Sequence, residues 1–105
     1  LQNKNKSEAK KILEEIILSK NKFYSILALN TILEKNLLED KIKIIEYFKF
    51  LEKINIEKEQ KDLLNFKKAL FLIKHSDKEK GYEILKKISD SDSTIKFLAK
   101  ELLDR

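Results

Sequence analysis

Apolar residues recur at helical spacing in six stretches of this chain, and short polar segments separate the stretches. In the first, Ala9, Ile12, Leu13, Ile16 and Ile17 lie at i, i+3, i+4, i+7 and i+8, on one helix face. The pattern predicts helices over about 8–18, 23–35, 38–54 and 57–74, and two shorter ones around 81–88 and 95–103. Short joints make neighbouring helices antiparallel, so we expect about three helical hairpins in a row.

Several polar residues are of the types that commonly begin or end helices. Ser7 is expected to cap the first helix, and Asn36 to end the second in a left-handed conformation. Ser76 and Glu79 have the spacing of a capping box, and Asp92 is expected to cap the last helix. Residues 1–6 show no periodicity and are interpreted as a lead-in or linker before a single domain at 7–105.

The chain repeats itself weakly. The segment SEAKKILEEI returns as EKGYEILKKI at an offset of about 72 residues, from Ala9 to Gly81, and SILALNTIL is answered by KFLAKELL, with Ala28 matching Ala99. Ala69 and Gly81 stand 12 positions apart on consecutive predicted helices. Two small residues at such places let two backbones approach closely, so we expect Ala69 and Gly81 to meet. A repeated pair of helices is the sequence signature of an α-solenoid.

These residues give the chain a resemblance to a divergent tetratricopeptide repeat domain, whose unit is roughly 34 residues long. The ending, ALFLI followed by GYEILKKISDSDSTIKFLAKELL, resembles the YfgM-like family. That resemblance implies a right-handed α-solenoid at the periplasmic face of the inner membrane, anchored through an upstream segment and associated with translocon or chaperone components. The cytoplasm is the alternative location. Asn65 stands where the repeat has a large aromatic residue, and the repeat's proline is absent. An irregular helix bundle and a HEAT-like array are the alternative folds.

In a tetratricopeptide-like register the first helix of each hairpin lines the concave side. The register therefore predicts a partner-binding surface for a segment of another protein. Its candidate residues are Leu29, Phe66, Leu70, Ile73, Lys96 and Lys100.

The amino-acid composition limits the possible fold classes and binding partners. The chain has no proline and one glycine, which argues against an all-β fold. Its net charge is +5, and every cation except Arg105 is a lysine, which we interpret mainly as compositional bias. Two alternatives remain: nucleic-acid binding through lysine-rich helix faces, and a homo-oligomer formed through the third helix or the exposed end of the first. The lysine clusters are Lys41, Lys43 and Lys49, and Lys67 and Lys68.

No motif of catalysis or cofactor binding is present in the sequence. Cysteine is absent, and the single histidine, His75, has Asp77 and Glu79 as its nearest acids, too few ligands for a zinc site. We therefore expect no enzyme activity, no metal and no cofactor. Methionine is also absent, so we expect the chain to be a fragment or a processed product. No apolar stretch of about 18 residues occurs, so we expect no membrane span within it.

Overall fold

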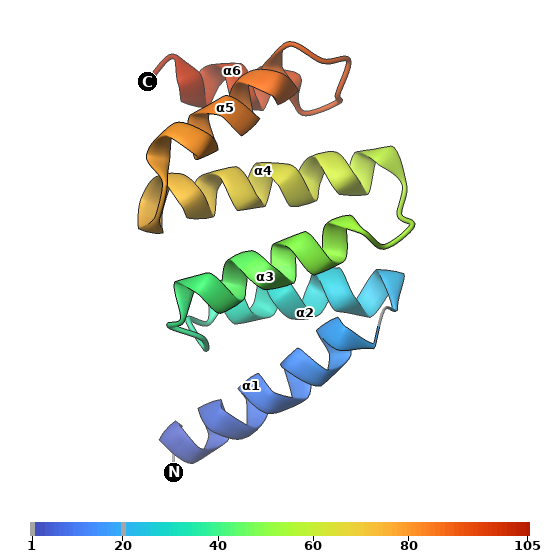
Figure 1. The fold of residues 1–105 in the computed structure, drawn as a ribbon, viewed down its shortest axis with the longest axis vertical. Coiled ribbons are helices and arrows are strands. Elements are labelled where there is room, and N and C mark those ends of the chain that lie inside the picture. Colours follow the sequence, from blue (N-terminus) through green and yellow to red (C-terminus); the bar gives the residue numbers. More distant parts are fainter. Residues whose placement is uncertain (1, 20) are drawn as a thin grey trace. The chain divides into compact units, whose positions relative to one another are not determined.

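The computed structural model describes residues 2–19 and 21–105, with side chains for 6–19, 21, 22 and 24–105. Every regular element in these residues is a helix, which confirms the predicted all-α class (Figure 1). The helices are α1 (Gln2–Leu18), α2 (Lys22–Glu34), α3 (Lys41–Glu52), α4 (Lys58–His75), α5 (Lys78–Ser89) and α6 (Lys96–Leu103). The side chain of Phe23, which the apolar pattern includes in the second helix, lies outside the described residues.

Helix α1 begins earlier than predicted. It starts at Gln2, so Ser7 lies inside the helix and does not cap it. Residues 2–6 contain no proline or glycine, and the helix therefore continues through them. The end of α2 follows the prediction. Asn36 has φ 55°, which confirms the predicted left-handed terminator.

The predicted caps of the last two helices are wrong. The N-cap of α5 is Asp77, whose carboxylate accepts a hydrogen bond from the Lys80 N–H at 3.2 Å, in place of the Ser76–Glu79 box. Asp92 does not cap α6, which begins after Ile95 without a side-chain cap. Aspartate accepts from the free N–H groups of a first turn as well as serine does, and the residue directly before the helix is the one in reach.

The chain divides into two compact units, residues 1–55 and 56–105. The first unit holds α1, α2 and α3, and the second unit holds α4, α5 and α6. In the second unit α5 packs against both α4 and α6.

The core of the second unit is a cluster of buried residues from α4, α5 and α6. Five partly buried residues pack against this cluster: Ile73, Ile84, Ile95, Leu102 and Leu103. The cluster consists of Phe66, Ala69, Leu85, Ile88 and Ala99.

Helices α4 and α5 approach each other most closely at Gly81. A β-carbon at this position would lie 2.7 Å from the carbonyl oxygen of Ala69 and 2.6 Å from Cγ1 of Ile73. Both distances are far below van der Waals contact, so glycine is required by the packing. This contact confirms the predicted meeting of Ala69 and Gly81, and it fixes the register of α5 on α4.

In the first unit α1 packs against α2, and Ser25 on α2 makes a polar contact with α1. This side chain is 0% exposed, and its hydroxyl donates to the carbonyl oxygens of Ile16 at 2.9 Å and Ile17 at 3.2 Å. The last carbonyls of a helix have no partner within the helix. Ser25 therefore supplies a donor to the carboxyl end of α1 from the neighbouring helix.

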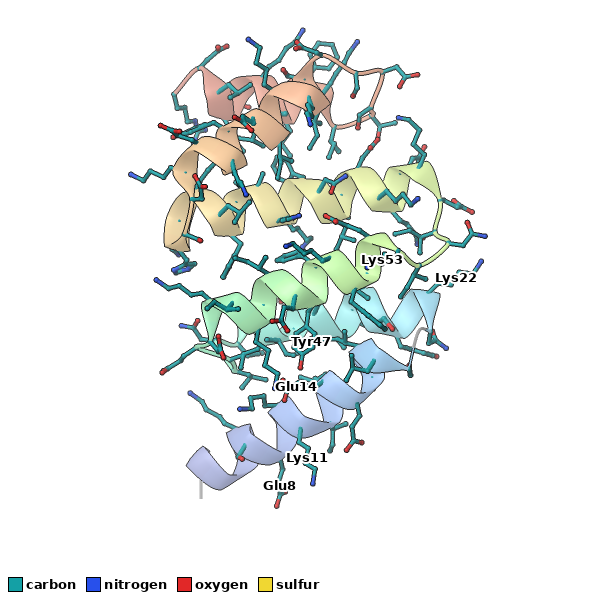
Figure 2. All side chains as sticks on the ribbon, viewed as in Figure 1. Glu8, Lys11, Glu14, Lys22, Tyr47 and Lys53 are labelled. Carbon is teal, nitrogen blue, oxygen red and sulfur yellow. The ribbon has the colours of Figure 1, made fainter. Side chains whose placement is uncertain are left out.

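A second polar contact joins α1 to α3. The Tyr47 hydroxyl on α3 donates to a carboxylate oxygen of Glu14 on α1, and Lys43 Nζ lies 3.2 Å from the same oxygen. Figure 2 shows Glu14 and Tyr47 pointing toward one another between these helices. The Glu14 carboxylate is mostly buried, and it holds α1 against α3 because both groups it contacts belong to one helix.

Candidate partner-binding surface

The six residues predicted to bind a partner occupy different environments. Leu29, in the first unit, is 1% exposed, and Phe66, in the second, is 7% exposed and belongs to the core cluster. Ile73 is partly buried against that cluster. These three side chains support the fold around them. Leu70, which is 38% exposed, and Lys100 are open to solvent, and Lys96 is partly exposed.

Lys96 and Lys100 lie on either side of a residue that the sequence analysis did not select. Phe97 is 70% exposed, and its ring centroid is 5.2 Å from Nζ of Lys96 and 5.7 Å from Nζ of Lys100. We call Lys96, Phe97 and Lys100 the α6 surface. A cation within about 6 Å of an aromatic face is attracted by the ring's quadrupole, by about 0.5–1 kcal/mol at exposed sites. Both ammonium groups are therefore held beside the ring.

The helical period explains why this aromatic residue faces solvent. Ile95, Ala99, Leu102 and Leu103 turn toward the core cluster, and Phe97 lies two residues from both Ile95 and Ala99. At about 100° per residue, that spacing places Phe97 on the opposite side of α6. The sequence carried this signal, since Phe97 falls outside the apolar stripe, directly follows Lys96 and has Lys100 three positions further along the helix. Leu98, assigned to the buried stripe, is instead exposed.

Charged residues at the end of α6 and on the loop before it form ion pairs with other side chains of this protein. The guanidinium of Arg105 lies 3.3 Å from the Glu101 carboxylate, one turn along the helix. On the loop before α6, Asp92 lies 3.1 Å from Nζ of Lys58, which also contacts Asp62 at 3.1 Å. The hydrogen bond to Asp92 is the main reason that the pKa of Lys58 is raised, and it lowers the pKa of Asp92. Lys58 thus connects the start of α4 to the loop that leads into α6.

The loop before α6 is further ordered by its serines. Ser91 accepts a hydrogen bond from the Ser93 N–H at 3.1 Å, and Ser93 in turn accepts one from the Ile95 N–H at 3.2 Å. Ser93 is buried, although it belongs to a segment that reads as a polar loop. These bonds fix where α6 begins, and with it the direction in which Phe97 points.

The lysine clusters of the nucleic-acid alternative are not uniformly free cations. Lys43 makes the ion pair with Glu14, so its charge is offset within the first unit. Lys41 and Lys49 are exposed on α3, and Lys67 and Lys68 are partly exposed on α4. Lys67 and Lys68 belong to the second unit, whereas Lys41, Lys43 and Lys49 belong to the first.

His75 closes α4, and its ring stacks against Phe71 with the centroids 5.3 Å apart at a tilt of 42°. Among the described residues, no three histidine or carboxylate side chains gather as metal ligands would. The helices described are also each too short or too polar to cross a membrane.

Comparison with known proteins finds no family model, no curated protein and no solved structure that matches this chain.

Proposed function

We propose that this chain is a non-catalytic protein-interaction module, and that its α6 surface binds an acidic segment of another protein. One observation supports this most directly: Phe97 is 70% exposed and has two lysine ammonium groups beside its ring. Aromatic residues, phenylalanine among them, are enriched at the centres of protein interfaces. The residues that the repeat register predicted, Lys96 and Lys100, lie at the same place.

Binding at this surface gains free energy from two sources. Covering a phenylalanine side chain that is open to water stabilises a complex by about 1.5–3 kcal/mol. A carboxylate of the partner beside Lys96 or Lys100 adds a charge pair, which becomes stronger as the partner removes water from the ring. A basic partner would be repelled by the same two ammonium groups, so the surface discriminates by charge.

Charges of both signs lie at the α6 surface. Glu101 on α6 is paired with Arg105, and Asp104 directly follows the helix. Protein interfaces commonly have both signs of charge around an apolar centre. Single-stranded nucleic acid, whose bases stack on aromatic rings, remains the competing ligand for the test below.

The finer architecture and location belong to the same proposal. We propose a tetratricopeptide-like solenoid of helical hairpins, and the close approach of Ala69 and Gly81 supports this because the repeat places small residues there. By its resemblance to the YfgM-like family, the chain would be the exported domain of an anchored bacterial protein that works beside translocon or chaperone components.

The test is a titration of the isotope-labelled chain followed by NMR. The probes are a 12-residue peptide of alternating glutamate and leucine, the same peptide with lysine for glutamate, a 12-nucleotide oligo-dT and vesicles of anionic phospholipid. The glutamate peptide is expected to shift the amide signals of α6, and Phe97→Ala should abolish that shift without changing the melting temperature. Tyr82→Ala, which removes another exposed aromatic residue, is the matched control. Binding of oligo-dT or vesicles alone would contradict the proposal.

A further inference from the structure

A groove of about 270 Å³ lies between α4 and α5 in the second unit, and we call it the α4–α5 groove. Its apolar lining consists of Ile88, which belongs to the core cluster, and Ile84, which packs against that cluster. The other lining residues are polar. The groove is lined by Asp62, Asn65, Lys68, Ile84, Lys87, Ile88 and Ser91.

The spacing of the lining residues shows how the groove runs. On α4 its residues recur every three positions, at Asp62, Asn65 and Lys68. On α5 they are Ile84, Lys87 and Ile88, and Ser91 lies in the loop that follows. Since the helix rises 1.5 Å per residue, Asp62 and Lys68 are separated by about 9 Å along the axis. That length matches about three residues of extended chain at about 3.3 Å each. The groove is therefore long enough for a short peptide segment and smaller than the usual 300–1,000 Å³ of a drug-sized pocket.

The charges that line the groove are predominantly positive. Lys87 and Lys68 come from opposite helices, and Lys87 is exposed. The single acid, Asp62, already has the ammonium of Lys58 at 3.1 Å, so its charge is offset. Ser91 is held as well, because its hydroxyl donates to the Ile88 carbonyl oxygen at 2.7 Å. An anion is therefore favoured beside Lys87, and an aliphatic group is favoured against the two isoleucines.

We propose that the α4–α5 groove binds a short extended peptide in which a branched aliphatic side chain is flanked by carboxylates. The aliphatic side chain rests on Ile84 and Ile88, and a carboxylate pairs with Lys87. This site is separate from the α6 surface and does not depend on it, since the two share no residue.

The test uses the capped pentapeptide acetyl-Glu-Asp-Leu-Asp-Glu-amide, titrated into the labelled chain at low salt and followed by NMR. Amide signals of residues 62–68 and 84–91 are expected to shift. Lys87→Glu should weaken binding about fivefold or more, as reversing one member of a surface charge pair predicts. Lys86→Glu is the matched control, because it makes the same change in net charge at the neighbouring position, outside the groove. It should weaken binding less than about twofold.

A second comparison tests the aliphatic contact. Replacing the leucine of the probe by glycine should remove most of the shifts, because the apolar part of the contact is lost. Equal weakening by Lys86→Glu and Lys87→Glu, or equal shifts with the glycine probe, would overturn the proposal in favour of general charge attraction. Phe97→Ala separates the two sites: it should leave pentapeptide binding at the groove unchanged even if the α6 surface binds nothing.

Discussion

The carbonyl oxygen of Ala69 lies 2.7 Å from the point where a β-carbon on Gly81 would stand. The obstacle is backbone rather than the end of a flexible side chain, so it cannot turn aside. Cγ1 of Ile73, at 2.6 Å from the same point, closes the other side. The second unit therefore depends on the missing side chain of its one glycine for the packing of α5 against α4.

Replacing this glycine by alanine should destabilise the protein. Gly81→Ala gains about 1 kcal/mol in helix propensity but overpacks the contact, which costs about 1–3 kcal/mol. We expect a net loss in the free energy of unfolding, measured by urea denaturation. Adding Ile73→Ala should not restore stability, because the Ala69 carbonyl oxygen still obstructs the new carbon. A gain in stability from Gly81→Ala would show that the two helices can separate at no cost.

Phe66 should behave as a core residue. It packs with Ala69, Leu85 and Ile88 in the second unit, so Phe66→Ala is expected to cost about 3–5 kcal/mol of folding free energy. Leu70→Ala, on the same helix at a partly exposed position, is the matched comparison and should cost clearly less. Thermal melts of both variants measure the difference. Similar losses for the two, or a Phe66→Ala variant as stable as the parent, would mean that Phe66 faces a surface after all.

The polar contact between α1 and α3 should make stability depend on pH. Burial alone would raise the pKa of Glu14, but the hydrogen bonds from Tyr47 and Lys43, with the charge of Lys43, outweigh it and lower the pKa. Burial, together with the hydrogen bond donated to Glu14, raises the pKa of Tyr47. A carboxyl whose pKa is lowered by folding stabilises the folded state above its ordinary pKa, about 4.3, and this contribution is lost as the pH falls through the folded value.

Tyr47→Phe tests this contact by removing the hydroxyl alone. It should cost about 1.5–3 kcal/mol at neutral pH, as expected for a hydrogen bond to a charged group. The difference from the parent should shrink as the pH is lowered from about 7 to about 3, because protonated Glu14 no longer benefits fully from the hydroxyl. Melting temperatures across this range provide the measurement. Tyr82→Phe, at an exposed tyrosine, should match the parent at every pH; a constant difference for Tyr47→Phe would refute the linkage.

Ser25 should matter more than its size suggests. Ser25→Ala removes the donor shared by the Ile16 and Ile17 carbonyls, and the buried Ile17 oxygen loses a partner, at a cost of about 1 kcal/mol. Ser19→Ala is the matched control, since its exposed hydroxyl also donates to the Ile16 carbonyl, at 2.6 Å. Chemical denaturation should show a smaller change for Ser19→Ala. The reverse order would mean that solvent replaces the Ser25 hydrogen bonds.

The helices themselves follow from local sequence. Apolar spacing of three and four residues, and the absence of proline, are properties of neighbouring positions, so six helices could be predicted. Their bounds agree with the observed ones within a few residues, except at the start of α1, which begins at Gln2. The left-handed conformation of Asn36 was also local, because asparagine tolerates positive φ. One tertiary contact, between Ala69 and Gly81, could also be predicted from the sequence. These two small residues lie on consecutive helices joined by a short turn, and each has few possible partners other than the other.

The surfaces were decided by the tertiary structure. The apolar stripe of a helix shows which residues share one face. It does not show how much of that face the neighbouring helices bury. Leu98 shares the stripe of Ala99 and is exposed, whereas Phe66, predicted to line a surface, is enclosed by α5 and α6. The partnership of Glu14 with Tyr47 joins helices that are separated by all of α2, and no local pattern marks either residue for the other. Such contacts depend on how the helices pack in three dimensions, because burial is a property of the assembled helices and not of any one of them.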